Sequence, residues 1–119
     1  MRIAIVKYNA GNVESVKNAL NRLNIEPILT DDADELKSAD RVIFPGVGEA
    51  SSAMRFLREK RLDETIKNLT QPVLGICLGM QLLCDYSEEN DTRCLGILPY
   101  KVRKFESKDL KIPQMGWNN

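Results

Sequence analysis

The 119-residue sequence contains no histidine and only three cysteines, Cys77, Cys84 and Cys94. The cysteines have no CxxC spacing, so neither a zinc site nor a disulfide framework is supported, and free thiols in a reducing compartment fit better. We therefore expect no metal and no cofactor. Cys84 is expected in the core, and Cys94 is expected to be incidental.

The chain also lacks an excess of charge of one sign and a long hydrophobic run. Lys and Arg number 17, as do Asp and Glu, and no basic block is present that would follow a phosphate backbone. No stretch approaches the roughly 18 apolar residues of a membrane span, and the N-terminus turns polar too early for a signal peptide. Nucleic acid and membrane are not expected as partners, and we expect a cytoplasmic protein.

Apolar runs of the length of buried strands are present in an otherwise mixed sequence. At 119 residues with 43% hydrophobic content, the chain is long enough for one domain with a core and too short for two. The runs lie at residues 3–6, 27–29, 42–44 and 73–76. The near-continuous apolar character of three of these runs predicts strands covered on both faces, as in parallel sheets.

Helical periodicity separates these runs. It predicts helices at residues 13–23, around residues 33–36, and at residues 49–69. Asn12 is the expected N-cap of the first helix, and a break is expected near Lys60. The alternation predicts a three-layer α/β/α sandwich with a mostly parallel sheet. Further on, residues 86–93 (YSEENDTR) resemble a polar loop, and residues 96–105 (GILPYKVRKF) a strand pair or a bent strand.

Residues 75–79 (GICLG) have the G-x-nucleophile-x-G form of a nucleophile elbow at a strand-to-helix junction. The glycines leave room for the backbone, so that Cys77 can adopt an unfavourable dihedral pair. A thiol at a helix N-terminus gains thiolate character, and the Leu78 N–H would point to a developing oxyanion. The alternative is a buried cysteine at a strand end.

Residues 45–48 (PGVG) follow the predicted strand that ends at Phe44. Two glycines around Val47 permit a backbone that turns an N–H toward the same crevice, although a simple turn before a helix is the alternative. Because ligands of α/β proteins bind at the carboxyl ends of strands, the two loops together indicate a site there.

Four segments resemble, in order and spacing, the class I (triad type) glutamine amidotransferases, which have a flavodoxin-like fold. They are residues 8–12 (YNAGN), 44–50 (FPGVGEA), 75–83 (GICLGMQLL) and 112–118 (IPQMGWN). Several members share GICLGMQ, whereas PGVG together with PQMGWN is most similar to the glutaminase subunits of imidazole glycerol phosphate synthase in histidine biosynthesis.

The resemblance implies that Cys77 attacks the side-chain amide of glutamine, forms a glutamyl thioester and releases ammonia. It implies oxyanion N–H donors at Leu78 and Val47. The substrate-binding positions that it implies are Gly46, Gly48, Gly79 and Gln81.

In the family, the ammonia passes to a (β/α)8-barrel cyclase or synthase subunit, which implies a heterodimer. Asn12 and Trp117 would lie toward that partner. From the residues alone, Trp117 could equally be a core anchor and Gln81 an exposed polar residue on an amphipathic helix.

The chain departs from the family because it lacks the His-x-Glu segment that supplies the base and its orienting acid, which in the family follows the part matched here. We therefore expect residues 1–119 to be the N-terminal part of a single, C-terminally truncated domain with an incomplete sheet. Alone, it should be nearly inactive, and exposed apolar surface should favour self-association.

Three other interpretations stay open. The chain could be a glutaminase subunit of anthranilate or aminodeoxychorismate synthase, or a cysteine hydrolase of another α/β family. It could also be a non-catalytic flavodoxin-like module that binds phosphate or flavin at its strand ends. A G-x-G-x-x-G fingerprint would favour that module, but residues 11–20 (GNVESVKNAL) contain a single glycine.

Overall fold

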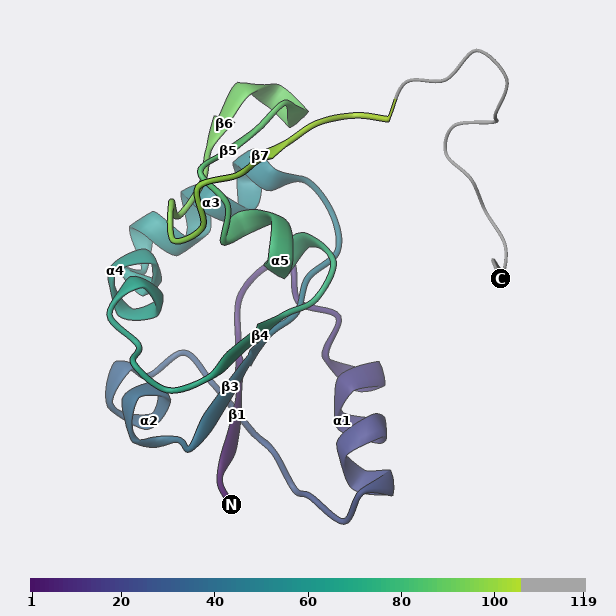
Figure 1. Cartoon of the computed structure of the whole chain (residues 1–119). Coiled ribbons are helices and arrows are strands. Elements are labelled where there is room, and N and C mark those ends of the chain that lie inside the picture. Colours follow the sequence, from purple (N-terminus) through teal and green to yellow (C-terminus); the bar gives the residue numbers. More distant parts are fainter. Residues whose placement is uncertain (106–119) are drawn as a thin grey trace.

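The computed structural model describes residues 1–105, in which helices cover both faces of a central sheet (Figure 1). The strands are β1 (Ile3–Val6), β2 (Ile28–Thr30), β3 (Arg41–Phe44) and β4 (Val73–Gly75). They pair in parallel in the order β2-β1-β3-β4. The helices are α1 (Val13–Arg22), α2 (Ala33–Ser38), α3 (Ala50–Glu59), α4 (Leu62–Lys67) and α5 (Leu78–Leu82). The predicted α/β architecture is therefore confirmed.

Side chains alternate across the sheet and build one apolar cluster on each face. The larger cluster joins α2, α3, α4 and α5 to the sheet residues Ala4, Val6, Val42 and Phe44. On the opposite face α1 covers Ile3, Ile5 and Ile43. Cover on both faces thus holds for β1 and β3, but not for β4, where Leu74 is 58% exposed on the α1 side.

The strand order creates a topological switch point between β1 and β3. The chain leaves β1 through α1 to reach β2 on one side, then returns through α2 to β3 on the other side. Loops that follow the carboxyl ends of β1 and β3 therefore diverge around a crevice, where doubly wound proteins bind their ligands. These loops are residues 7–12 and 45–49.

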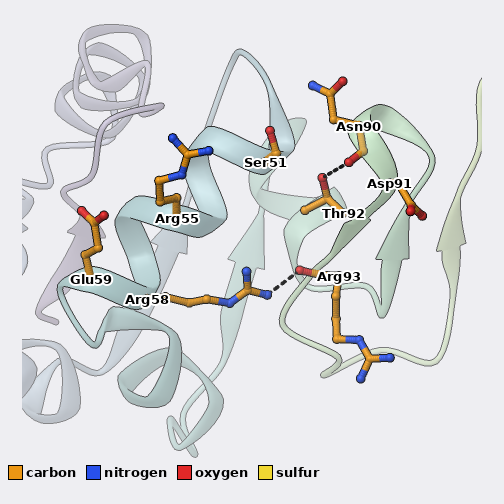
Figure 2. A pocket seen from close by; sticks show the side chains of 8 residues that line it. All are labelled: Ser51, Arg55, Arg58, Glu59, Asn90, Asp91, Thr92 and Arg93. Carbon is orange, nitrogen blue, oxygen red and sulfur yellow. Dashed lines mark hydrogen bonds between the residues drawn. The ribbon is translucent and has the colours of Figure 1, made fainter.

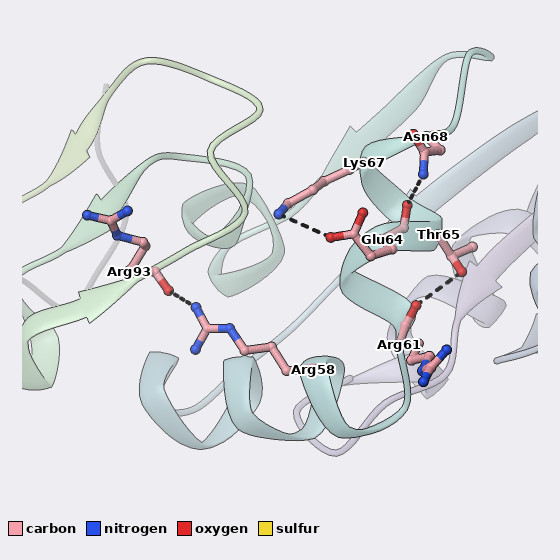
Figure 3. A network of polar contacts seen from close by, with 7 residues as sticks. All are labelled: Arg58, Arg61, Glu64, Thr65, Lys67, Asn68 and Arg93. Carbon is pink, nitrogen blue, oxygen red and sulfur yellow. Dashed lines mark hydrogen bonds and ion pairs between the residues drawn. The ribbon is translucent and has the colours of Figure 1, made fainter.

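The expected break in the third predicted helix is present and separates α3 from α4. Arg61 has a φ of 57°, in the left-handed region, and its carbonyl oxygen accepts from the Thr65 hydroxyl at 3.3 Å (Figure 3). Asn12 occupies the N-cap position of α1, as expected, but its side chain makes no cap hydrogen bond. Within residues 1–105, no helix combines the length and apolar character needed to cross a membrane.

Residues 86–93, expected as a polar loop, form a small hairpin instead. It consists of β5 (Tyr86–Ser87), the 3-10 helix η1 (Glu89–Asp91) and β6 (Thr92–Arg93), with the single strand β7 (Lys101–Val102) beside β5. Asn90 and Asp91 make the tight turn possible with φ values of 53° and 49°, which these residue types tolerate. Arg58 joins the hairpin to α3 by donating to the Arg93 carbonyl oxygen at 2.7 Å (Figure 3).

We predict that the Leu57→Ala substitution in α3 lowers the free energy of unfolding by about 2–5 kcal/mol, because it leaves a cavity in the larger cluster. Leu57 is fully buried there, whereas Leu23 at the end of α1 is 68% exposed. Leu23→Ala should therefore cost less than about 0.5 kcal/mol. Urea unfolding of both variants measures the difference, and equal costs would contradict this packing.

Candidate functional site

Cys77 lies on the sharp turn between β4 and α5 and is exposed to solvent. Its φ of 55° and ψ of −118° are strained for a residue with a side chain, as expected for an elbow. A Cβ at Gly79 would overlap the Phe44 carbonyl group, and one at Gly75 would lie 2.8 Å from the Met80 Cα. Glycine is therefore required on both sides of the turn.

The other two thiols are enclosed in the protein. Cys84 is buried, as expected, and Cys94, which was expected to be incidental, packs in the larger cluster. Burial raises the pKa of Cys84, and burial, with the Cys84 charge added, raises the pKa of Cys94 to about 11. Cys77 is thus the only accessible nucleophilic thiol of the three.

The loop after β3 places one peptide, between Gly46 and Val47, beside the elbow. The Leu78 N–H donates to the Gly46 carbonyl oxygen at 3.1 Å, and the Val47 N–H donates to the Ala10 carbonyl oxygen at 2.6 Å. Both N–H groups expected as oxyanion donors are therefore bonded within the protein in this structure. Gly48, at the end of the loop, has a φ of 111° that favours glycine.

Tyr8, in the loop after β1, reaches across the switch point to the same segment. Its hydroxyl donates to the Pro45 carbonyl oxygen at 2.5 Å, and its ring centroid lies 5.2 Å from that of Phe44. Sequence reasoning assigned Tyr8 no role, although it begins the YNAGN segment. Its position directly after the central strand was the available signal, because the carboxyl ends of β1 and β3 are adjacent.

The other end of the loop is fixed by the cap of α3. Glu49 accepts from the Ser51 N–H at 3.0 Å, the Ser52 N–H at 2.8 Å, the Ser51 hydroxyl and the Asn90 amide. The hydrogen bond from the Ser51 hydroxyl, then that from Asn90, lower the pKa of Glu49 to about 2. The cap therefore also connects the hairpin to the start of α3.

Gln81, one turn into α5, is half-buried and lines a cavity of about 440 Å³. The backbone N–H of Gln81 donates to the Cys77 carbonyl oxygen at 3.1 Å. The cavity therefore begins one helical turn from the elbow. The remaining lining residues are Ser87, Glu88, Glu89, Val102, Arg103 and Lys104. Two carboxylate residues and two cationic residues thus line the cavity, and Glu88 and Glu89 each accept one backbone N–H, from Lys104 and Ala50.

A second cavity, of about 370 Å³, lies between α3 and the hairpin (Figure 2). Arg55, Arg58 and Arg93 line it, together with polar residues of the hairpin. Neither Cys77 nor Gln81 contributes to it, so it is separate from the elbow.

Of the two residues expected to face a partner, the structure describes one. Asn12 is exposed immediately before α1, and Trp117 lies outside the described residues. Over residues 1–105, no three His, Cys, Asp or Glu side chains gather in a way that could hold a metal ion.

Known proteins resemble the chain along nearly its whole length. A family model described as a CobB/CobQ-like glutamine amidotransferase domain matches residues 2–112. A protein of Bacteroides fragilis strain YCH46, named imidazole glycerol phosphate synthase subunit HisH, is 54% identical over 99% of this chain and 61% of its own length. The proteins of that name from Idiomarina loihiensis and Haemophilus influenzae strain Rd are 50% and 48% identical, over 60% and 59% of their own lengths.

The chain thus spans about three fifths of the length of these curated relatives. A solved structure titled "Crystal structure of glutamine amidotransferase" superposes with a TM-score of 0.73 at 22% identity. The superposition covers 87% of this chain and 57% of the chain of the solved structure, and this similarity supports the fold.

We predict that Gly79→Ala lowers the free energy of unfolding by about 3 kcal/mol or more, because the new methyl group meets a backbone carbonyl that cannot move aside. Gly11→Ala is the matched control, since a Cβ there lies 3.4 Å from the Val13 Cγ2 atom, near ordinary contact. Denaturant unfolding compares the two. A cost at residue 79 as small as that at residue 11 would mean that α5 does not rest on β3.

We predict a pH-dependent contribution of Glu49 to stability. Because the folded-state pKa of Glu49 is lowered to about 2, the contribution is complete above the unfolded pKa of about 4.5 and is lost as the pH falls toward 2. Glu49→Gln should therefore flatten the dependence of unfolding free energy on pH between about 4.5 and 2. Glu59→Gln is the matched control, because it removes a carboxylate at the exposed end of the same helix and leaves the cap hydrogen bonds of Glu49 in place.

Proposed function

The chain belongs to the CobB/CobQ-like glutamine amidotransferase family, and we propose that it carries the nucleophile of a glutaminase subunit of imidazole glycerol phosphate synthase. The observation that supports this most directly is the exposed Cys77, held at a φ of 55° on a G-x-C-x-G elbow. The names of the relatives support this pathway over anthranilate or aminodeoxychorismate synthase. We further propose a cytoplasmic heterodimer with a (β/α)8-barrel cyclase subunit.

In the proposed reaction, the Cys77 sulfur attacks the carbonyl carbon of the glutamine side chain and forms a tetrahedral oxyanion. The C–N bond then breaks, ammonia leaves with a proton, and water hydrolyses the remaining glutamyl thioester to glutamate. Gln81 and the charged residues of its cavity supply groups that suit the carboxylate and ammonium of glutamine. No cofactor takes part in these steps.

A proton carrier is needed for the leaving ammonia, and the 119 residues contain no histidine. We propose that the base and its orienting acid are supplied from outside these residues. In this proposal, residues 1–119 are the N-terminal part of one glutaminase domain, in agreement with the three fifths of the relatives' length that they match.

The peptide between Gly46 and Val47 suits a two-state oxyanion site. In the described arrangement its carbonyl occupies the Leu78 N–H. If this peptide turned over, it would free that N–H and direct the Val47 N–H to the same side. Two donors would then face the oxyanion, the usual arrangement for stabilising acyl-transfer intermediates.

We predict that Cys77→Ser in the intact protein, assayed with its synthase partner, lowers glutamate release from glutamine by about 10³-fold or more, because the nucleophile of the covalent step is lost. Cys94→Ala removes a buried thiol and should leave the rate within about twofold. Labelling with a diazo-oxo-norleucine should mark Cys77 alone and be prevented by glutamine. Retention of turnover in Cys77→Ser would contradict the proposal.

The pathway is tested separately by growth. A bacterial strain that lacks its own glutaminase subunit for histidine synthesis should grow without histidine when it carries the intact protein, and not when that protein carries Cys77→Ser. Failure of the active protein to restore growth would contradict the pathway while leaving the glutaminase chemistry intact.

A further inference from the structure

We propose that Tyr8 is a positioning residue that fixes the start of the loop at residues 45–48 and thereby limits its rearrangement to one peptide, between Gly46 and Val47. The inference rests on the proposed function, because it concerns how that loop presents an N–H to the substrate carbonyl. It assigns a role to a residue that does not touch the substrate.

Three contacts define the place of the Tyr8 side chain. The hydroxyl donates to the Pro45 carbonyl oxygen at 2.5 Å, and the ring packs at 5.2 Å from the Phe44 ring in a tilted arrangement. The phenol oxygen lies so close to Gly46 that a Cβ there would overlap it. The phenol therefore holds the backbone where β3 ends and the loop begins, and it fits there because residue 46 is a glycine without a Cβ.

The hydroxyl stays a donor over a wide pH range. Tyr8 is buried, and burial, with the negative charge of Cys77 added, raises its pKa well above the usual range. The phenol is therefore protonated at neutral pH and well above it, and the Pro45 carbonyl keeps its partner there. A buried carbonyl that lost this partner would be unsatisfied, which is unfavourable.

The three hydrogen bonds around the loop respond differently to rotation of the peptide. The bonds from Leu78 to Gly46 and from Val47 to Ala10 exist only in the described arrangement, because each uses a group of the rotating peptide. The bond from Tyr8 uses the carbonyl of the preceding peptide, which does not have to move. Tyr8 therefore favours neither orientation, and instead excludes looser arrangements of the loop.

The test is Tyr8→Phe in the intact protein with its synthase partner. This substitution keeps the ring and removes only the hydroxyl. We expect kcat for glutamate release to fall roughly five- to tenfold, the factor that one neutral hydrogen bond is worth, with KM within about twofold. Alkylation of Cys77 by iodoacetamide forms no oxyanion and should keep its rate. Hydrogen exchange of the Val47 amide should become roughly five- to tenfold faster.

Tyr100→Phe is the matched control, because it removes the phenol hydroxyl of a tyrosine that is 63% exposed to solvent. It should change none of these readouts. Unchanged Val47 exchange in Tyr8→Phe would overturn the inference. A parallel fall of turnover and of the alkylation rate would also overturn it, because that result indicates general damage to the site. A rise of kcat would overturn it too, because that result indicates that Tyr8 stabilises the resting arrangement of the loop. If the unsubstituted protein releases no glutamate, the proposed function fails, and the exchange measurement still decides the role of Tyr8.

Discussion

Helix α5 rests on the end of β3 with no side chain between the two backbones. Gly79 lies against the Phe44 carbonyl, and the Ile76 N–H donates to that same oxygen at 3.0 Å. Because the chain must turn from β4 into α5 within this small space, Cys77 takes up a positive φ and its side chain stands clear of the core. The exposure of the thiol and the direction of the Leu78 N–H both follow from this close approach.

The loop after β3 is held at both ends by side chains and in the middle by two backbone hydrogen bonds. Tyr8 fixes its start through the Pro45 carbonyl, and the capping carboxylate of Glu49 fixes its end at the first turn of α3. Between them lies the peptide that joins Gly46 to Val47, and the absence of a Cβ at Gly46 widens the backbone angles open to it. This arrangement concentrates conformational freedom in one peptide unit next to Cys77, while the sheet and α3 stay in place.

The sequence predicts the layers of the fold and the elbow, because both depend on local patterns. The apolar runs around Ile5 and Ile43 are long enough to indicate strands covered on both faces, and GICLG marks the turn by its spacing. The hairpin at residues 86–93 could not be predicted in this way, since its strands have two residues each and depend on contacts with α3 and β7. The orientation of the peptide after Gly46 likewise depends on the distant Ala10 carbonyl.

That orientation has an energetic consequence for any carbonyl that approaches the elbow. The Leu78 N–H already has an acceptor, the Gly46 carbonyl, which is tethered to the same fold and so is present at high effective concentration. An incoming carbonyl exchanges one hydrogen bond for another and gains only the difference between them. The loop therefore acts as an intramolecular competitor, and in the proposed two-state site its preference between the two orientations sets the fraction of the protein that is open to that ligand.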